Sequence, residues 1–140
     1  LALIVLDVDH FKSINDKYGH KVGDRALKLI AGLVRSALRE TDFLARYGGE
    51  EFVALLPNTD IRQAVLVAEK LRLAIESSDF QHQNRGVPIT ISLGIATFRA
   101  GDSAEEVFIR ADEALYRAKA DGRNRHAVET ANAAAGRRNS

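Results

Sequence analysis

Carboxylate side chains gather at two points of the sequence where a strand is expected to end or begin. Asp7 and Asp9 follow the apolar run of residues 1–6, and Glu50 and Glu51 directly follow a Gly-Gly pair. Like charges this close together repel one another unless a cation lies between them. Hard oxygen ligands of this kind suit Mg²⁺ or Mn²⁺, which complete their coordination shells with substrate phosphates. The pattern therefore indicates a divalent-metal site for a phosphorylated substrate.

Each pair of acids also has an ordinary structural explanation. A glycine turn followed by acids is commonly a solvated hairpin tip, and Asp9 would equally end a strand in a turn that faces water. Asp7 fits this explanation less well, because it follows an uninterrupted apolar run and charged groups are rarely buried without a partner. Asp7 is therefore the stronger candidate ligand.

The elements around these acids are expected to bring them to one edge of a sheet. Residues 1–6 lack any polar interruption, which is typical of a strand buried on both faces. The Gly-Gly pair between two apolar segments predicts an antiparallel hairpin of residues 43–47 and 52–56. We therefore expect Asp7 and Glu50 to converge across neighbouring strands.

The remaining segments alternate amphipathic helices with strands. Residues 10–23 are expected to form a short helical turn and a loop, and Asp24 to cap a helix that ends near Arg39. A second helix is expected after a cap at residues 57–60, followed by a polar loop over 77–87 with an exposed His82. A strand is expected over 88–98, with room for a bulge at Gly94. The last elements expected are a helix that begins at the capping box of 103–106 and stops at Gly122, and an edge strand over 124–128. This order predicts an α+β fold with a mostly antiparallel sheet flanked by helices and split βαβ character, rather than a doubly wound fold.

Composition bounds the class of protein. A chain of 140 residues that is 46% hydrophobic and 28% charged is typical of one globular domain with its own core. The net charge of +1 gives no basic field for a nucleic-acid polymer, although single nucleotides stay open as partners. Because the chain has no cysteine, disulfides, thiolate metal sites and cysteine nucleophiles are excluded. No apolar run is long enough to span a bilayer, and a cytoplasmic location is expected.

Familiar nucleotide and zinc motifs are absent from the sequence. There is no Gly-x-x-x-x-Gly-Lys-Ser/Thr segment and no Gly-x-Gly-x-x-Gly segment that opens a helix. The four histidines lack the His-Glu-x-x-His spacing of zinc hydrolases. A strand-end aspartate and a hairpin glutamate remain, which is how palm-type polymerases and cyclases hold their metals.

Four motifs stand in one order along the chain. They are Asp7-Val8-Asp9-His10-Phe11-Lys12-x-x-Asn15-Asp16-x-x-Gly19-His20-x-x-Gly23-Asp24, Arg46-Tyr47-Gly48-Gly49-Glu50-Glu51-Phe52, Arg110-Ala111-Asp112, and Lys119-Ala120-Asp121-Gly122-Arg123-Asn124. Together they resemble the GGDEF domains of bacterial diguanylate cyclases. The resemblance implies a palm-like, nucleotidyl-cyclase-like fold with a ferredoxin-like βαββαβ core.

The resemblance also bears on the limits of the domain. It runs from residue 1 to about residue 128, whereas the family ordinarily begins earlier, with an Asp-x-Leu-Thr-x-Leu-x-Asn-Arg segment and a helix. We therefore expect a GGDEF domain over residues 1–129 that lacks the family's N-terminal helix. Residues 130–140 are alanine-rich and polar at the end, which predicts a disordered tail.

The resemblance implies condensation of two GTP molecules into cyclic di-GMP, with release of two pyrophosphates. Asp7, the main-chain carbonyl of Val8 and Glu50 would hold Mg²⁺ or Mn²⁺, two ions in each half-site, against the triphosphate. Glu51 would accept the proton of the attacking 3′-hydroxyl. A salt bridge between Glu51 and Lys12 is its structural alternative.

Other matching positions are implied to bind the nucleotide. They are Lys12, Lys119 and Arg123 at the phosphates, Asn15 and Asp24 at the guanine edge, and His20 near the nucleotide. Lys119 and Arg123 equally suit the negative end of a helix dipole. His20 equally suits an exposed loop.

Arg39 and Asp42 form an Arg-x-x-Asp segment ahead of the Gly-Gly turn that resembles the family's inhibitory product site. An arginine fork matches guanine O6 and N7, and a carboxylate accepts from the ring N–H and the amine. The ordinary explanation is an arginine at a helix end followed by a turn-forming aspartate. Lys70 stands where some relatives have a second arginine, and a lysine cannot form the same fork.

Two rival functions stay open at this point. A catalytically silent GGDEF module would bind GTP or cyclic di-GMP as a receptor, although the intact Asp7, Glu50 and Glu51 argue against it. Cyclisation within one GTP would give cyclic GMP by similar metal chemistry. If the protein is a diguanylate cyclase, each chain holds one GTP, so two chains must face each other as a homodimer. A sensory domain is expected outside these residues, in a free cytoplasmic protein or in the cytoplasmic part of a membrane-bound sensor.

Overall fold

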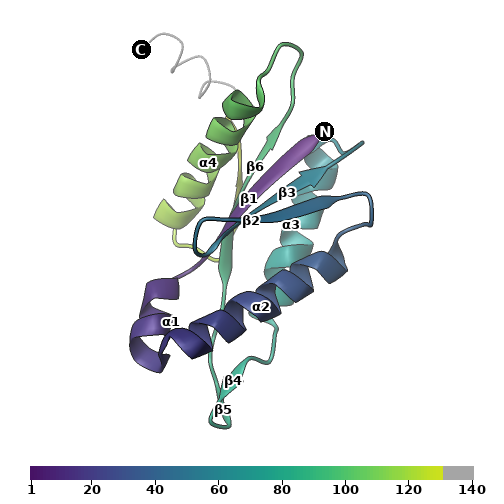
Figure 1. The fold of residues 1–140 in the computed structure, drawn as a ribbon. Coiled ribbons are helices and arrows are strands. Elements are labelled where there is room, and N and C mark those ends of the chain that lie inside the picture. Colours follow the sequence, from purple (N-terminus) through teal and green to yellow (C-terminus); the bar gives the residue numbers. More distant parts are fainter. Residues whose placement is uncertain (131–140) are drawn as a thin grey trace.

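A computed structural model describes residues 1–130, which form a five-stranded sheet with helices on both faces (Figure 1). The elements in chain order are β1 (Ala2–Val8), α1 (Phe11–Tyr18), α2 (His20–Ala37), β2 (Phe43–Tyr47), β3 (Glu51–Leu56), α3 (Ile61–Glu76), β4 (Gln81–His82), β5 (Arg85–Gly86), β6 (Ile91–Thr97), α4 (Ala104–Ala120) and β7 (His126–Val128). From residue 131 on, the expected tail lies outside the described residues. None of the helices in the described part combines the length and apolarity needed to cross a membrane.

The central sheet has the strand order β2-β3-β1-β6-β7. Every neighbouring pair is antiparallel except β6 and β7, which are parallel. The buried β1 therefore lies at the middle of the sheet, as its uninterrupted apolar sequence predicts. The predicted α+β class, with a mostly antiparallel sheet flanked by helices, is confirmed.

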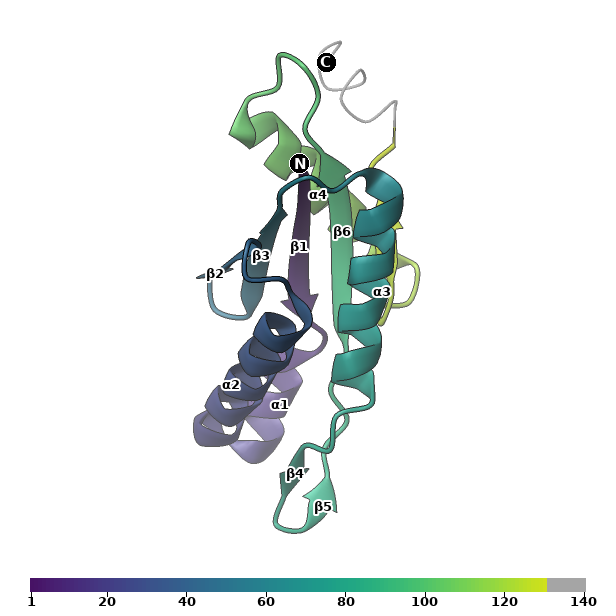
Figure 2. The same cartoon turned by 90° about the vertical axis from the view of Figure 1, so that its right-hand side faces the viewer.

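Alternate residues of β1 face two separate cores. Ile4 and Leu6 pack with α2 and α3, whereas Leu3 and Val5 pack with α4. Figures 1 and 2 show α3 and α4 on opposite faces of the sheet. Because side chains alternate along a strand, Asp7 continues the series of Leu3 and Val5 onto the α4 face.

The segment after β1 contains more helix than predicted. Helix α1 is followed almost directly by α2, with Gly19 at a φ of 94° between them. The prediction that Asp24 caps a helix is wrong, because Asp24 lies exposed inside α2. Val22 is buried and extends the apolar stripe of α2 backward by one turn.

The predicted bulge at Gly94 is also wrong. Gly94 lies in continuous register between Val5 of β1 and Ala127 of β7. It is required by a close approach of α4, since a Cβ there would lie 2.0 Å from the carbonyl oxygen of Ala111 and 2.4 Å from the amide nitrogen of Leu115.

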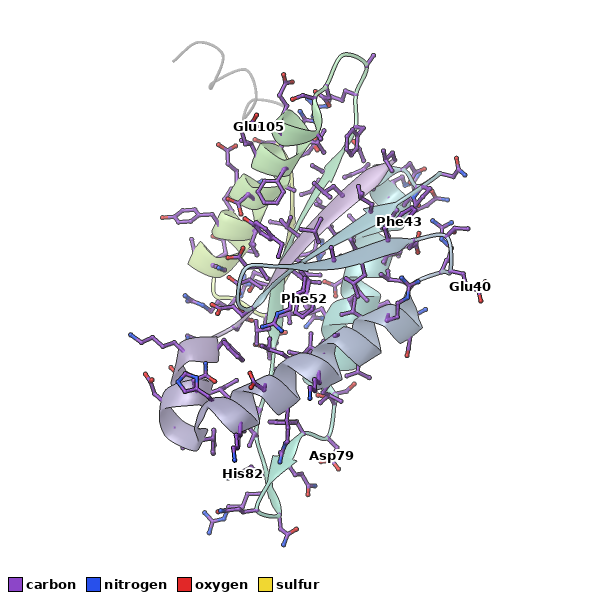
Figure 3. All side chains as sticks on the ribbon, in the orientation of Figure 1. Glu40, Phe43, Phe52, Asp79, His82 and Glu105 are labelled. Carbon is purple, nitrogen blue, oxygen red and sulfur yellow. The ribbon has the colours of Figure 1, made fainter. Side chains whose placement is uncertain are left out.

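Residues 77–87 form more than the predicted polar loop. They contain the β4–β5 hairpin, which Figure 2 shows projecting from the end of the molecule opposite the N-terminus. His82, labelled in Figure 3, is half-buried and meets the ring of Tyr18 edge-on at 5.8 Å, so the prediction of an exposed histidine is wrong.

Other local predictions hold. Asp60 and Gln63 form a reciprocal capping box at the start of α3. At the start of α4 Ser103 accepts from the amide of Glu106, which is one half of the predicted capping box. The β2–β3 hairpin is present, and β3 begins at Glu51.

The outer strand β2 forms one edge of the sheet. Its Phe43 is 66% exposed, whereas Phe52 on the neighbouring β3 is 2% exposed, and Figure 3 labels both. β2 is therefore the more open of the two hairpin strands.

Candidate active site

The register of β1 and β3 brings the two pairs of acids together. Asp7 is the cross-strand partner of Glu51, and the amide of Val8 donates to the carbonyl of Glu50 at 3.2 Å. Asp7 is 5% exposed, because it continues a strand buried on both faces. The expected convergence of a strand-end acid and a turn acid is therefore present.

The electrostatics of this cluster are those of an incompletely neutralised acidic site. Burial, and then the charges of Asp7 and Glu51, raise the pKa of Glu50, and the nearby Lys119 only partly opposes them. The ammonium group of Lys119 forms an ion pair with Asp7 Oδ2. The other oxygen, Asp7 Oδ1, is buried without a hydrogen-bond partner. A buried carboxylate oxygen of this kind favours a cation beside it.

A pocket of about 170 Å³ opens beside these acids. It is lined by Asp7, Val8, Asp9, His10, Phe11, Lys12, Glu50, Lys119 and Arg123. The structure thus brings the expected metal ligands and the expected phosphate-binding cations around one cavity. Among the described residues no ion pair joins Glu51 to Lys12, so the structural alternative for Glu51 is not observed.

The residues expected at the guanine lie apart from this pocket, on α1 and α2. Asn15 of α1 lies against Gly23 of α2, where a Cβ would be only 1.8 Å from Asn15 Oδ1. That oxygen is buried and has no hydrogen-bond partner. His20 and Asp24 are exposed on α2. Of the three, Asn15 alone has a buried polar atom without a hydrogen-bond partner.

Arg39 and Asp42 lie beyond the other end of α2 and bind each other. The Arg39 guanidinium donates to Asp42 Oδ1 at 2.9 Å, to the Pro57 carbonyl at 2.8 Å and to Thr59 Oγ1 at 2.9 Å. Burial alone would raise the pKa of Asp42, but the hydrogen bonds and charge of Arg39 hold it below its ordinary value. Asp42 is therefore a buried, paired carboxylate.

Helix α2 ends near Arg39, as predicted, but Arg39 itself lies just beyond the last turn. The helix ends at Ala37, and Arg35 occupies its last turn instead. Lys70 donates to the Ala37 carbonyl at 3.3 Å, so it lies at this same end of α2. The Arg39 side chain is 55% exposed, which leaves part of the guanidinium open to solvent.

The family model described as diguanylate cyclase, GGDEF domain, matches residues 1–125. The chain belongs to the GGDEF domain family. Diguanylate cyclase DgcP of Pseudomonas aeruginosa is 52% identical over 125 residues, which cover 89% of this chain and 19% of that protein. The chain therefore spans about a fifth of the length of this curated relative.

Solved GGDEF domains have the same fold. The active GGEEF domain of a diguanylate cyclase from Vibrio cholerae is 37% identical with a TM-score of 0.85, over 92% of this chain and 82% of that one. The GGDEF domain of DgcB from Caulobacter crescentus, solved in complex with c-di-GMP, is 36% identical with a TM-score of 0.86, over 91% and 76%.

The donor set of this GGDEF domain fits a divalent metal that is shared with a substrate. Within residues 1–130 no three acidic or histidine side chains converge closely enough to hold an ion by themselves. Asp7, Val8 and Glu50 line the same pocket, and hard oxygen donors in this small number need phosphate oxygens to complete a shell. The unpaired Asp7 Oδ1 supports this fit.

Asp9 has a role in the site that the sequence did not reveal. Its carboxylate accepts from Thr90 Oγ1 at 2.8 Å, from Ser92 Oγ at 2.7 Å and from the amide of Asn124 at 2.9 Å. Asp9 therefore fastens the end of β1 to β6 and to the loop after α4. The hydroxyl residues that flank the start of β6 are a weak signal for this contact, since their partner is more than 80 residues away in sequence.

Arg110, from the third motif, is part of the packing rather than of the pocket. It is 2% exposed and donates to both oxygens of Asp102, at 3.1 and 2.7 Å, and to the Thr97 carbonyl at 2.8 Å. These bonds hold α4 against the end of β6. A motif residue thus serves to position the helix that carries Lys119.

Proposed function

We propose that this chain is the catalytic domain of a diguanylate cyclase that converts two GTP into cyclic di-GMP and two pyrophosphates. One observation carries the proposal, namely that a single pocket is lined by Asp7, Glu50, Lys12, Lys119 and Arg123. Negative and positive groups in one small cavity suit a metal-bound triphosphate.

Comparison with solved domains supports activity over a silent module. The segment Gly48-Gly49-Glu50-Glu51-Phe52 has the same letters as the GGEEF domain described as active in Vibrio cholerae. A module that only bound nucleotide would have no need for both the metal ligands and a proton acceptor. We therefore favour catalysis, with a receptor role as the alternative.

The acids and cations of the pocket have separate roles in this proposal. Asp7, Glu50 and the Val8 carbonyl would hold Mg²⁺ or Mn²⁺, which when bound neutralises the triphosphate and polarises its phosphoryl oxygens. Lys12 and Arg123 would bind phosphate oxygens as charge-assisted donors. Two ions in each half-site are expected from the family resemblance.

Glu51 is the proposed proton acceptor. The 3′-oxygen of one GTP forms a bond to the α-phosphorus of the other, the bond from that phosphorus to the β-phosphate oxygen breaks, and pyrophosphate leaves. The proton of the 3′-hydroxyl passes to the Glu51 carboxylate. The same exchange with the two nucleotides in opposite roles closes the ring.

Asn15 is the proposed reader of guanine, assisted by Asp24, with His20 near the nucleotide. The buried, unpaired Oδ1 of Asn15 supports this role, because the guanine amine is a donor that would satisfy it. Asp24 is exposed on the same pair of helices and would accept from the ring N–H. Adenine lacks this arrangement of donors.

Each domain would hold one GTP, so the active unit is a homodimer with the two pockets facing. We propose residues 1–129 as the domain, with a sensory domain elsewhere in a longer protein. A cytoplasmic location follows from the use of GTP as substrate. No nucleic-acid polymer is expected as a partner.

The test is product analysis after incubation with GTP and Mg²⁺ over a range of protein concentrations. We expect cyclic di-GMP and pyrophosphate, at a rate per chain that rises with concentration because two loaded chains must meet. Cyclic GMP as product would support the rival cyclisation within one nucleotide. GTP binding without turnover at any concentration would support the silent module, and a rate per chain that stays flat would contradict assembly-limited half-sites.

We also propose that Arg39 and Asp42 bind the product. The solved complex of the DgcB domain with c-di-GMP supports product binding in this family. In this chain Asp42 is buried and already paired with Arg39, so the exposed part of the Arg39 fork would make the first contact with guanine. Lys70 at the same helix end would add a point charge for a phosphate.

Arg39→Ala should weaken binding of cyclic di-GMP by about 1–3 kcal/mol, the contribution of one bidentate arginine–guanine contact. Calorimetry with the purified domain measures this loss, and Arg62→Ala on the exposed face of α3 is a matched control that should change nothing. Unchanged affinity in Arg39→Ala would contradict this inhibitory site and leave the cyclase proposal intact.

A further inference from the structure

The loop after α4 has an unusual backbone at the pocket. Gly122, Arg123 and Asn124 have φ values of 125°, 62° and 48° in succession. The first part of this turn is set by the helix end, since the amide of Gly122 donates to the Lys119 carbonyl at 3.3 Å and the amide of Arg123 to the Ala118 carbonyl at 3.0 Å. Nothing in that helix-end motif determines the conformation of Asn124.

Asn124 is held instead by two other parts of the fold. Its amide donates to Asp9 Oδ2 at 2.9 Å, which joins it to the end of β1. Its side chain bridges to α3, where Arg72 donates to Asn124 Oδ1 at 3.2 Å and Asn124 Nδ2 donates to Glu76 Oε2. Asparagine adopts left-handed backbone more readily than most residues, and these contacts add a tertiary restraint that holds Asn124 in it.

The α3 side of this bridge is itself a connected cluster. Arg72 donates to both oxygens of Glu69, with a closest contact of 2.9 Å. Nδ1 of His126 lies 2.6 Å from Glu69 Oε1, and because a carboxylate only accepts, this nitrogen carries the proton. Within this cluster Arg72 and Glu76 hold the Asn124 side chain, and both belong to α3, which does not line the pocket.

We propose that Asn124 is a positioning residue for the phosphate end of the pocket. The clamp on its side chain fixes the left-handed turn, and this turn directs the neighbouring Arg123 into the cavity shared with Asp7 and Lys119. The inference rests on the proposed function, in which Arg123 binds the triphosphate. It assigns to α3, which does not line the pocket, a part in holding a nucleotide-binding loop.

Asn124→Gly is the substitution that separates positioning from folding. Glycine accepts the left-handed backbone and keeps the amide that donates to Asp9, so only the bridge to Arg72 and Glu76 is lost. Asn58→Gly is the matched control, because Asn58 is also left-handed, with a φ of 53°, is exposed, and lies at the far end of α3. Both variants carry the same change in backbone freedom.

The measurement is calorimetric affinity, with Mg²⁺, for α,β-methylene GTP and for GMP. The methylene analogue keeps three phosphates and cannot release pyrophosphate. Wild type should bind the analogue more tightly than GMP. Asn124→Gly should weaken the analogue about tenfold, as lost supporting contacts commonly do, and leave GMP unchanged. Arg72→Gln should shift affinity in the same direction, and Asn58→Gly should behave as wild type.

A double variant tests the route through Arg123. In an Arg123→Ala background, Asn124→Gly should add little further loss, because the side chain that it directs is already absent. A full additional loss there, or an unchanged preference for the analogue in Asn124→Gly, would overturn the inference while the cyclase proposal stands. A wild type with no preference for the analogue over GMP would overturn both.

Discussion

Asp7→Asn should lower the conversion of GTP to cyclic di-GMP by about a thousandfold. The substitution keeps the shape of the side chain and removes one negative charge from the pair that it forms with Glu50. At the buried Oδ1 position, asparagine places either its amide oxygen, which is a weaker metal ligand than a carboxylate oxygen, or its amide NH2 group, which cannot bind a cation. Pyrophosphate release at saturating GTP and Mg²⁺ measures the loss.

The fold should survive this substitution. The ion pair with Lys119 is lost, but the repulsion that contributes to the raised pKa of Glu50 is relieved at the same time. Asp79→Asn is the matched control, since Asp79 is exposed near the distant β4–β5 hairpin (Figure 3), and it should keep full activity. Normal turnover in Asp7→Asn, with Mg²⁺ as the only divalent ion, would contradict the proposed ligand set.

The central part of the site was predictable because it depends on short-range patterns. The period of two along β1 and the Gly-Gly turn between β2 and β3 determine which residues meet, and the observed register pairs Asp7 with Glu51. The position of Lys119 in the last turn of α4 follows similarly from the apolar stripe of that helix. The family motifs added the identities of the roles, which remain proposals.

Other features depended on contacts between distant segments and could not be predicted. Gly19 and Gly23 suggested a loop. Gly23 instead lies inside α2, where Asn15 of α1 occupies the space that a side chain would need. Arg39, which pairs with Asp42, also donates to Thr59 in the turn before α3, a contact between distant parts of the sequence. The three donors to Asp9 come from β6, the segment before it and the loop after α4.

Gly94→Ala should destabilise the protein by more than about 3 kcal/mol, which is above the usual range for an overpacked core. The new methyl group would lie 2.0 Å from the Ala111 carbonyl and 2.4 Å from the Leu115 amide, and both are backbone atoms of α4. A flexible side chain cannot turn aside to make room, so α4 must move away from β6. The free energy of unfolding from urea titration measures the change.

Gly32→Ala is the matched control with the opposite sign. Gly32 lies exposed inside α2, and nothing lies within 4 Å of the position that its Cβ would take. Alanine there should stabilise the protein by about 0.5–1 kcal/mol, because it restricts the unfolded chain more than glycine does. Since α4 carries Lys119, Gly94→Ala should also weaken nucleotide binding at temperatures where it is still folded. A Gly94→Ala protein as stable as wild type would show that the Ala111 carbonyl of α4 does not lie as close as 2.0 Å to the position of a Cβ on residue 94.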